Sequence, residues 1–234
     1  MLRSGKLVTI VAISVITSAA NAQHPIVLNK LQEINAEAPQ PSLAEIKGAV
    51  AATAKAVADA NHTCAPTEVV VADVTPVTGA RTVLSAVLAG QLRNGWALYA
   101  THSGCPGANS YRYMVLQQPD GNLVAPLVNE GTTYANPSII RDTSAQAAMA
   151  AFQKSVTLDA KCDGKDMKMG PTRVSSQGAD LGPDVYGVRY VGSWSEVWQF
   201  ETCGKTFDVP VEFTADGDGG AYTNIKSADL AAVR

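Results

Sequence analysis

The four cysteines of this chain are spaced as two equal pairs. Cys64 and Cys105 are 41 residues apart, as are Cys162 and Cys203, and each second-half cysteine lies 98 residues after its first-half counterpart. A fixed offset of this kind is the signature of an internal repeat, and it predicts a tandem duplication of one structural unit. Two further features share the offset of 98 residues: Trp96 with Trp194, and Asp120-Gly121 with Asp218-Gly219.

The first 22 residues have the features of a secretory signal peptide. Arg3 and Lys6 give a positive start, an apolar run extends over residues 7–16, and cleavage is expected after Ala22. The apolar run is too short to span a bilayer, so a transmembrane anchor is not expected. We expect an exported protein, periplasmic or extracellular, with no membrane anchor once the signal peptide is cleaved.

Export determines the chemistry expected of the cysteines. In an oxidising compartment, two equal pairs of thiols indicate disulfides rather than nucleophiles or metal ligands. Pairing within each half, Cys64–Cys105 and Cys162–Cys203, is the favoured connectivity, although the two other pairings respect the duplication equally well. Each bridge within a half would contribute roughly 4 kcal/mol in the chain-entropy model. The spacing matches no zinc site, and no metal is predicted.

The composition narrows the classes of function. Apolar residues make up 46% of the chain, which is enough for real hydrophobic cores. The formal net charge is −3, and loss of Arg3 and Lys6 with the signal peptide takes it to −5. An acidic protein lacks the basic surface that holds phosphate backbones, so nucleic acid is not an expected partner. The common phosphate-loop, nucleophile-elbow and zinc-protease motifs do not occur, so no cofactor is predicted and an enzyme is not favoured.

The helices are predicted to begin at recognisable caps. Residues 23–41 form a polar arm or linker with a short helix at 26–37. Ser42 and Glu45 form a capping box for a helix that should end near Asn61. In the second half, Thr143 and Gln146 suggest a similar cap, followed by Met149, Phe152 and Val156 at helical spacing.

Strands are predicted to follow each helix as an antiparallel meander. Asn94-Gly95 and Gly192-Ser193 favour tight two-residue turns, and the turns at 119–122 and 216–220 should close further hairpins. Pro210 within the strand 207–213 predicts an edge strand or a bulge.

Together these patterns predict an α+β fold of two tandem-duplicated modules, residues 42–140 and 141–234. Each module would have one helix packed on an antiparallel meander of four or five strands, with one disulfide. The segments 75–86 and 171–184 are predicted to be irregular loops, because they are rich in Pro, Gly, Thr and Ser.

The strand from Trp194 to Cys203 carries the best candidate for a binding site. Trp194, Glu196 and Trp198 fall on one face, because side chains alternate along a strand. A carboxylate between two indole rings can bind a cation, a sugar or an arginine of a partner protein. The alternative is that this face points inward, with Glu196 at the sheet rim or paired with Arg189.

The segment His102-Ser103-Gly104-Cys105 is the only hint of nucleophilic catalysis. Cys105 is expected to be oxidised, and His102 and Ser103 should point to opposite faces of a strand, so a structural histidine is the favoured interpretation. No catalytic residue is predicted from this segment.

The layout of helix-plus-meander modules, each with its own disulfide, resembles that of secreted β-lactamase inhibitory proteins. The resemblance rests on layout and carries no residues over. We expect a non-enzymatic exported binding protein, an inhibitor or immunity-type partner of another exported protein. The alternatives are a small-molecule or glycan-binding module that uses Glu196 and Trp198, and an uncharacterised periplasmic hydrolase.

Overall fold

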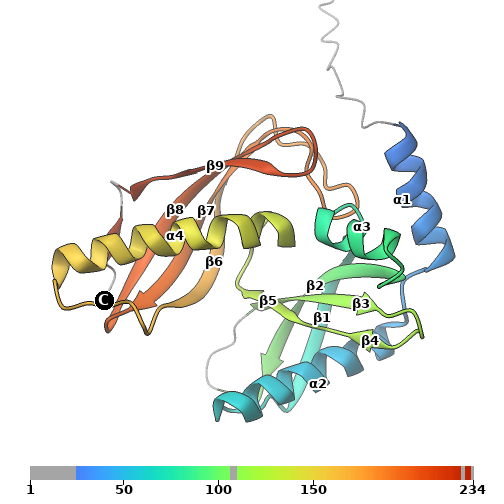
Figure 1. The fold of residues 1–234 in the computed structure, drawn as a ribbon. Helices are drawn as coiled ribbons and strands as arrows, with labels where there is room; N and C mark the ends of the chain where they lie inside the picture. Colours follow the sequence, from blue (N-terminus) through green and yellow to red (C-terminus); the bar gives the residue numbers. More distant parts are fainter. Residues whose placement is uncertain (1–24, 106–109, 228–229, 233–234) are drawn as a thin grey trace, which may run out of the picture.

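The protein is an α+β structure with two antiparallel five-stranded sheets, called A and B in chain order (Figure 1). The computed structural model describes residues 25–105, 110–227 and 230–232. The expected signal peptide, residues 1–22, lies outside the described residues. Within the described ranges, no helix is both long enough and apolar enough to cross a membrane.

Two helices precede sheet A. Helix α1 spans Pro25–Glu37, which confirms the helix expected in the N-terminal arm, and α2 spans Leu43–Asn61. The expected capping box begins α2. The Ser42 hydroxyl accepts from the Glu45 backbone N–H, and the Glu45 carboxylate accepts from the Ser42 N–H at 2.9 Å. Such a cap stabilises a helix by about 1 kcal/mol.

Sheet A has the strand order β1-β2-β3-β4, and β5 also pairs with β3. Its strands are β1 (Glu68–Pro76), β2 (Asn94–Ser103), β3 (Ser110–Gln117), β4 (Leu123–Val124) and β5 (Leu127–Glu130). A helix that the sequence did not predict, α3 (Arg81–Leu88), lies between β1 and β2. The segment 75–86 is therefore not an irregular loop.

One core joins α2 to sheet A. The buried residues of this core are Ile46, Val50 and Ala54 of α2 with Val69, Trp96, Leu98, Ala100, Tyr113, Val115 and Ala125. Because they come from one stripe of the helix and one face of the sheet, α2 covers that face (Figure 1).

Asn94 holds α1 against sheet A. Its side-chain amide donates to the Ala38 carbonyl and the Asn35 side chain, both at 2.9 Å, and its oxygen accepts from the Thr78 hydroxyl at 2.6 Å. Asn94 and Gly95 are the first two residues of β2, so the predicted tight turn is wrong. The asparagine supplies buried hydrogen bonds rather than a turn conformation. The Asn-Gly pair in the sequence does not distinguish these two roles.

Sheet B has the strand order β10-β8-β7-β6, and β9 also pairs with β8. Its strands are β6 (Lys168–Gln177), β7 (Ser193–Thr202), β8 (Lys205–Ala215), β9 (Ala221–Ile225) and β10 (Ala231–Ala232). Strand β6 occupies residues expected to be a loop. The tight turn expected at Gly192-Ser193 is also wrong, because Ser193 begins β7 at the end of a long connection.

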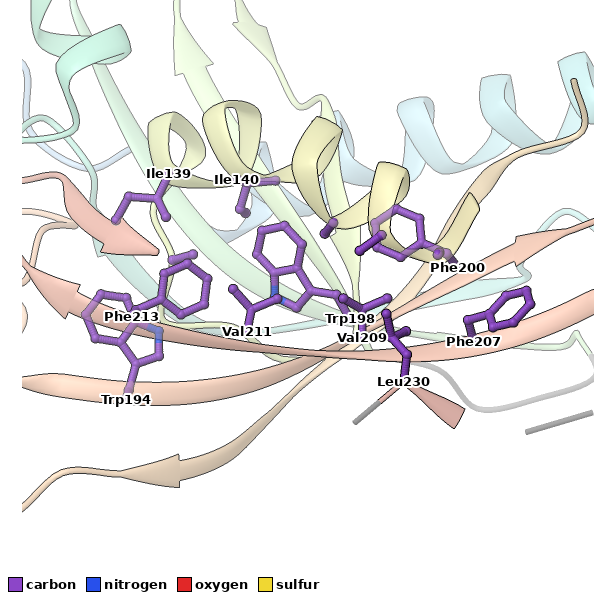
Figure 2. Close-up of a cluster of buried hydrophobic side chains, with 14 residues drawn as sticks. Ile139, Ile140, Trp194, Trp198, Phe200, Phe207, Val209, Val211, Phe213 and Leu230 are labelled. Carbon is purple, nitrogen blue, oxygen red and sulfur yellow. The ribbon is translucent and has the colours of Figure 1, made fainter. Parts of the chain in front are cut away.

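Helix α4 (Pro137–Leu158) covers one face of sheet B (Figure 2). It begins earlier than predicted: the Asn136 side chain caps it by accepting from the N–H groups of Ser138 and Ile139, and Pro137 follows at the first position. Proline is favoured there because its ring fixes φ and it needs no N–H partner. Thr143 is therefore inside the helix, and the expected boundary between residues 140 and 141 falls within α4.

The buried core of sheet B is rich in aromatic side chains. It contains Trp194, Trp198, Phe200, Phe207, Val209, Val211, Phe213 and Leu230, which pack against Ala135, Ile139, Ile140, Ala147, Ala150 and Ala151 (Figure 2). The helix face that packs is thus formed largely by alanines. Met149, which was named only for its helical spacing with Phe152 and Val156, is 53% exposed.

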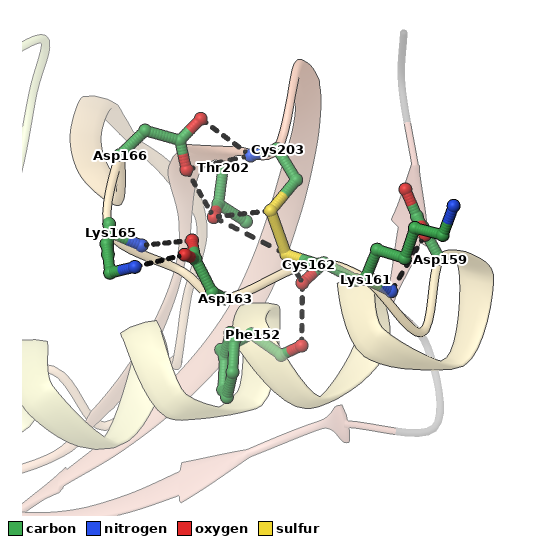
Figure 3. Close-up of a disulfide and its surroundings, with 10 residues drawn as sticks. Phe152, Asp159, Lys161, Cys162, Asp163, Lys165, Asp166, Thr202 and Cys203 are labelled. Carbon is green, nitrogen blue, oxygen red and sulfur yellow. Dashed lines mark hydrogen bonds and ion pairs between the residues drawn. A yellow bond between two sulfur atoms is a disulfide. The ribbon is translucent and has the colours of Figure 1, made fainter.

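The central hairpins of the two sheets have the same register at an offset of 98 residues. The matching pairs are Trp96–Val115 with Trp194–Phe213, and Leu98–Tyr113 with Glu196–Val211. In each half a disulfide joins the end of the helix to the turn of this hairpin. The bridges are Cys64–Cys105 and Cys162–Cys203, each with Cα atoms 5.7 Å apart, which is the expected pairing. Figure 3 shows the second of them.

Pro210 lies in the central strand β8 rather than at an edge, so the sequence prediction was wrong. Its carbonyl accepts from the Lys226 N–H at 3.0 Å, on the side away from β7. The ring nitrogen points to the same side. There β8 pairs with β9 through residues 211–215 and with β10 through residues 207–208, so Pro210 lies between the two pairings. The missing donor therefore breaks no bond to β7.

Candidate functional site

Glu196 is a buried carboxylate surrounded by five hydrogen-bond donors. One oxygen, Oε1, accepts from the Trp194 indole at 3.0 Å and from the backbone N–H groups of residues 134 and 135 at 2.7 and 3.2 Å. The other, Oε2, accepts from the Trp198 indole and the Thr133 hydroxyl, both at 2.7 Å. Glu196 and Trp198 are 0% exposed and Trp194 is 2% exposed. The structure thus satisfies this carboxylate with neutral donors.

This geometry corrects the predicted binding site. The three side chains do share one face of β7, but that face points into the core under α4 (Figure 2). Because the carboxylate is inaccessible and fully hydrogen-bonded, it does not offer a glycan or cation site in this conformation. The alternative that this face points inward is confirmed, but Glu196 is not paired with Arg189. Arg189 donates to the Gly182 carbonyl at 2.6 Å and lies over the Tyr134 ring.

The segment that Glu196 binds, residues 131–136, connects sheet A to α4. From the sheet A side, the Tyr99 hydroxyl donates to the Thr133 carbonyl at 3.1 Å, and Arg112 donates to the Ala135 carbonyl at 2.6 Å. From the sheet B side, the Thr172 carbonyl accepts from the Thr132 N–H at 2.8 Å. The connection is therefore held on both sides, and the buried glutamate is part of what fixes sheet B to sheet A.

Gly131 is required where this connection crosses β6. Its φ is +84°, in the left-handed region that favours glycine, and an added Cβ would overlap the carbonyl oxygen of Thr172. The close approach lets residues 131 and 172 form a parallel bridge between the two sheets.

His102 is part of an aromatic cluster on sheet A. Its ring stacks on Tyr111 with centroids 4.2 Å apart, and its Nε2 lies 3.1 Å from the Tyr113 hydroxyl. Burial lowers the pKa of His102, and burial together with the neighbouring Tyr111 raises the pKa of Tyr113 to about 12. Cys105 is in a disulfide, so it is not a nucleophile. The arrangement explains His102 as a packing residue.

Glu130 lies within reach of the charge of Glu201 across the boundary between the sheets. Burial and, second, the charge of Glu201 raise the pKa of Glu130. A pocket of about 320 Å³ lies beside Glu201, lined also by Asp166 and Lys168, but Glu130 is not among its lining residues. The pair therefore does not converge on that pocket, and it gives no reason to assign a hydrolytic reaction.

The face of sheet B opposite α4 is not covered by a helix of the described chain. We call it the helix-free face. Its polar side chains are held by bonds between strands: Arg173 pairs with Asp208 at 3.1 Å, and Gln199 donates to the same carboxylate at 3.1 Å. At the β9 end, Glu212 accepts from Asn224 and pairs with Lys226. Tyr222, beside them, is 73% exposed.

These residues were not predicted as a site from the sequence, although strand alternation gave a signal for them. The alternation that placed Trp194, Glu196 and Trp198 on one face also places Ser195, Val197 and Gln199 on the other. Deciding which face is buried requires knowing where α4 packs, and the sequence pattern of one strand does not contain that information.

Comparisons with protein-family models, curated protein sequences and solved structures found no match for this chain.

Proposed function

We propose that the chain arose by tandem duplication and that it acts as an exported, non-enzymatic binding protein. The duplication is supported by the element order: α2, β1, β2, β3 and β4 correspond to α4, β6, β7, β8 and β9. It is supported further by the shared register of the central hairpins and by equivalent disulfides. In this proposal the second module starts at Asn136, and α3 is an addition to the first module.

The exported location is supported by the two disulfides, since such bonds persist in oxidising compartments. The signal peptide expected at residues 1–22 stays part of the proposal.

The observation that carries the binding role is the helix-free face of sheet B. Residues there are preorganised by ion pairs and hydrogen bonds between strands, and an exposed tyrosine adjoins them. Tyrosine and arginine are the residue types that most often dominate protein interfaces, and a rigid surface loses little conformational entropy on binding. The partner we propose is another exported protein, for which this chain is an inhibitor or an immunity-type partner.

The experiment is affinity capture from the exported fraction of the source organism, with the mature chain immobilised. Three baits are compared: the unaltered protein, the double variant Arg173→Ala/Tyr222→Ala, and Met149→Ala as a control on the opposite side of sheet B. The proposal predicts one partner at a fixed stoichiometry with the unaltered protein and the control, and its loss with the double variant. Capture that is equal for all three baits would contradict the assignment of this face.

An inhibitor also changes the activity of what it binds. If the captured partner is an enzyme, titrating it with the unaltered protein should reduce its turnover to a plateau at the binding stoichiometry. Turnover that is unchanged at saturation would remove the inhibitor interpretation and leave a binding role alone.

A further inference from the structure

A small polar pocket lies where the first helix turns of α4 meet α3 and the turn between β8 and β9. Its volume is about 210 Å³. The elements are joined around it, because Thr82 at the start of α3 donates its N–H to the Ser138 hydroxyl at 3.3 Å, and Asn136 donates to the Gly219 carbonyl at 2.9 Å. The pocket therefore has walls from both halves of the chain, a common location for ligand sites.

One lining residue points to a ligand. Thr143 is 2% exposed and lines the pocket, yet no hydrogen bond of its hydroxyl is found within the described part of the chain. The hydroxyl is not one of the fully buried atoms that lack a partner in the described part of the chain, so it faces the pocket, where water or a ligand can bond to it. A polar group bound in the pocket would supply that partner.

The charged groups of the lining carry both signs. Arg81 lines one wall and takes part in none of the ion pairs between described residues. Asp142 and Asp216 also line the pocket. The Asp216 Oδ1 accepts from the N–H groups of Asp218 and Gly220, at 2.8 and 2.9 Å, which holds this carboxylate in place and leaves Oδ2 available. Asp142 accepts from Arg141 through Oδ1 alone.

We propose that this pocket binds a small free α-amino acid. A zwitterion matches the lining, with its ammonium group toward Asp142 and Asp216 and its carboxylate toward Arg81. The volume corresponds to roughly seven water molecules at about 30 Å³ each, which suits a molecule the size of serine or threonine. A neutral sugar would leave Arg81 without an ion-pair partner. The proposal is independent of the partner protein, because the pocket lies on the α4 side of sheet B.

The test is isothermal titration calorimetry of the mature protein with L-serine and L-threonine at millimolar concentrations. N-acetyl-L-serine lacks the ammonium group and L-serinamide lacks the carboxylate, so each should bind at least about tenfold more weakly, as expected for one lost charged contact. If no amino acid gives a saturable heat, or if the blocked compounds bind equally well, the proposal is wrong.

Variants locate the site. Thr143→Val should weaken binding several-fold while Thr143→Ser, which keeps the hydroxyl, retains it. Thr157→Val is the matched control at the far end of α4 and should leave binding unchanged. Arg81→Gln should also weaken binding. In nuclear magnetic resonance titrations the amides of residues 81–82, 138–146 and 216–223 should shift. Shifts confined to other residues, or affinity unaffected by both Thr143→Val and Arg81→Gln, would overturn the proposal.

Discussion

The buried carboxylate of Glu196 gives the sharpest prediction about stability. Glu196→Gln keeps the shape of the side chain but replaces one acceptor oxygen with an NH₂ donor. If the amide oxygen takes the place of Oε1, the NH₂ group faces the Thr133 hydroxyl and the Trp198 indole N–H. The hydroxyl can rotate to accept, but the indole cannot. The opposite orientation places the NH₂ group against three N–H donors.

The first orientation is the better one, and it leaves the Trp198 indole N–H without an acceptor. It also weakens the remaining hydrogen bonds, because a neutral amide replaces the charged carboxylate. An unsatisfied buried donor costs about 1–3 kcal/mol, and bonds to a charged group contribute about 1.5–3 kcal/mol. We expect Glu196→Gln to reduce the free energy of unfolding by about 2–3 kcal/mol. Glu196→Ala removes the acceptor of all five donors, of which only the Ala135 N–H has another among the described residues, the Thr133 hydroxyl at 3.0 Å. It should cost about 4 kcal/mol or more, a large share of the stability of an ordinary domain.

The assay is urea unfolding at pH 7 with the disulfides intact, followed by far-UV circular dichroism. Glu201→Gln is the matched control, since it changes an exposed carboxylate on the same strand and should cost less than about 0.5 kcal/mol. The double-mutant cycle with Trp198→Phe is more specific. Phenylalanine removes the donor that opposes the glutamine amide, so the double variant should be more stable than the sum of the single effects by about 1 kcal/mol or more. A Glu196→Gln variant as stable as the Glu201→Gln control would show that the five hydrogen bonds to Glu196 do not stabilise the fold.

Three further predictions follow from the structure. Gly131→Ala should lower the free energy of unfolding by several kcal/mol, because it combines a positive φ with a backbone overlap. Gly90→Ala, at φ +70° with open space around it, should lower it by only about 1–2 kcal/mol. Urea unfolding midpoints compare the two variants, and equal losses of stability would contradict the prediction. The pKa of His102 is lowered from its ordinary value of 6.5 by burial, so protonation favours the unfolded chain, and stability should fall as the pH drops below 6.5. The stability of His102→Gln should fall less than that of the unaltered protein over this pH range. If the free energy of unfolding of the two proteins changes identically from pH 8 to the acid side, the histidine does not contribute. Replacing the Cys162–Cys203 pair with alanines should cost about 4 kcal/mol in the chain-entropy model, and a loss below about 1 kcal/mol would argue against the bridge as a stabilising element.

Features set by short-range chemistry were predicted well from the sequence. The capping box at Ser42 depends on two side chains three residues apart, and the turns at 119–122 and 216–220 depend on residues that favour turn conformations. The disulfide pairing is the one that was favoured from the sequence, although the spacing fits the two other pairings equally well. In each case the determining atoms are close together along the chain or are tied by a simple repeat.

Features set by distant contacts were not predicted. Asn94 was interpreted as a turn residue because its partners, Asn35, Ala38 and Thr78, are not its neighbours in sequence. An inward-facing Glu196 was weighed from the sequence, but its partners were not predicted, because three of its donors come from residues 133–135, about sixty positions earlier. Pairing that far apart has no local signal.

The candidate surfaces show the same limit. The helix-free face could be listed from strand alternation, but identifying it as the uncovered face required the position of α4. The pocket at Thr143 combines residues from three segments of the chain, and Thr143 itself looked like a helix cap. Its unpartnered hydroxyl is visible only after folding.

The proposed binding role is tested most directly by hydroxyl-radical footprinting of the chain alone and in complex with its captured partner. Tyr222 on the helix-free face and Met149 on α4 are 73% and 53% exposed, so both react readily in the free protein. The account predicts that the oxidation rate of Tyr222 falls at least about fivefold in the complex, as expected when an exposed aromatic becomes buried at an interface, while that of Met149 stays unchanged. Protection of Met149 with Tyr222 left reactive would contradict it.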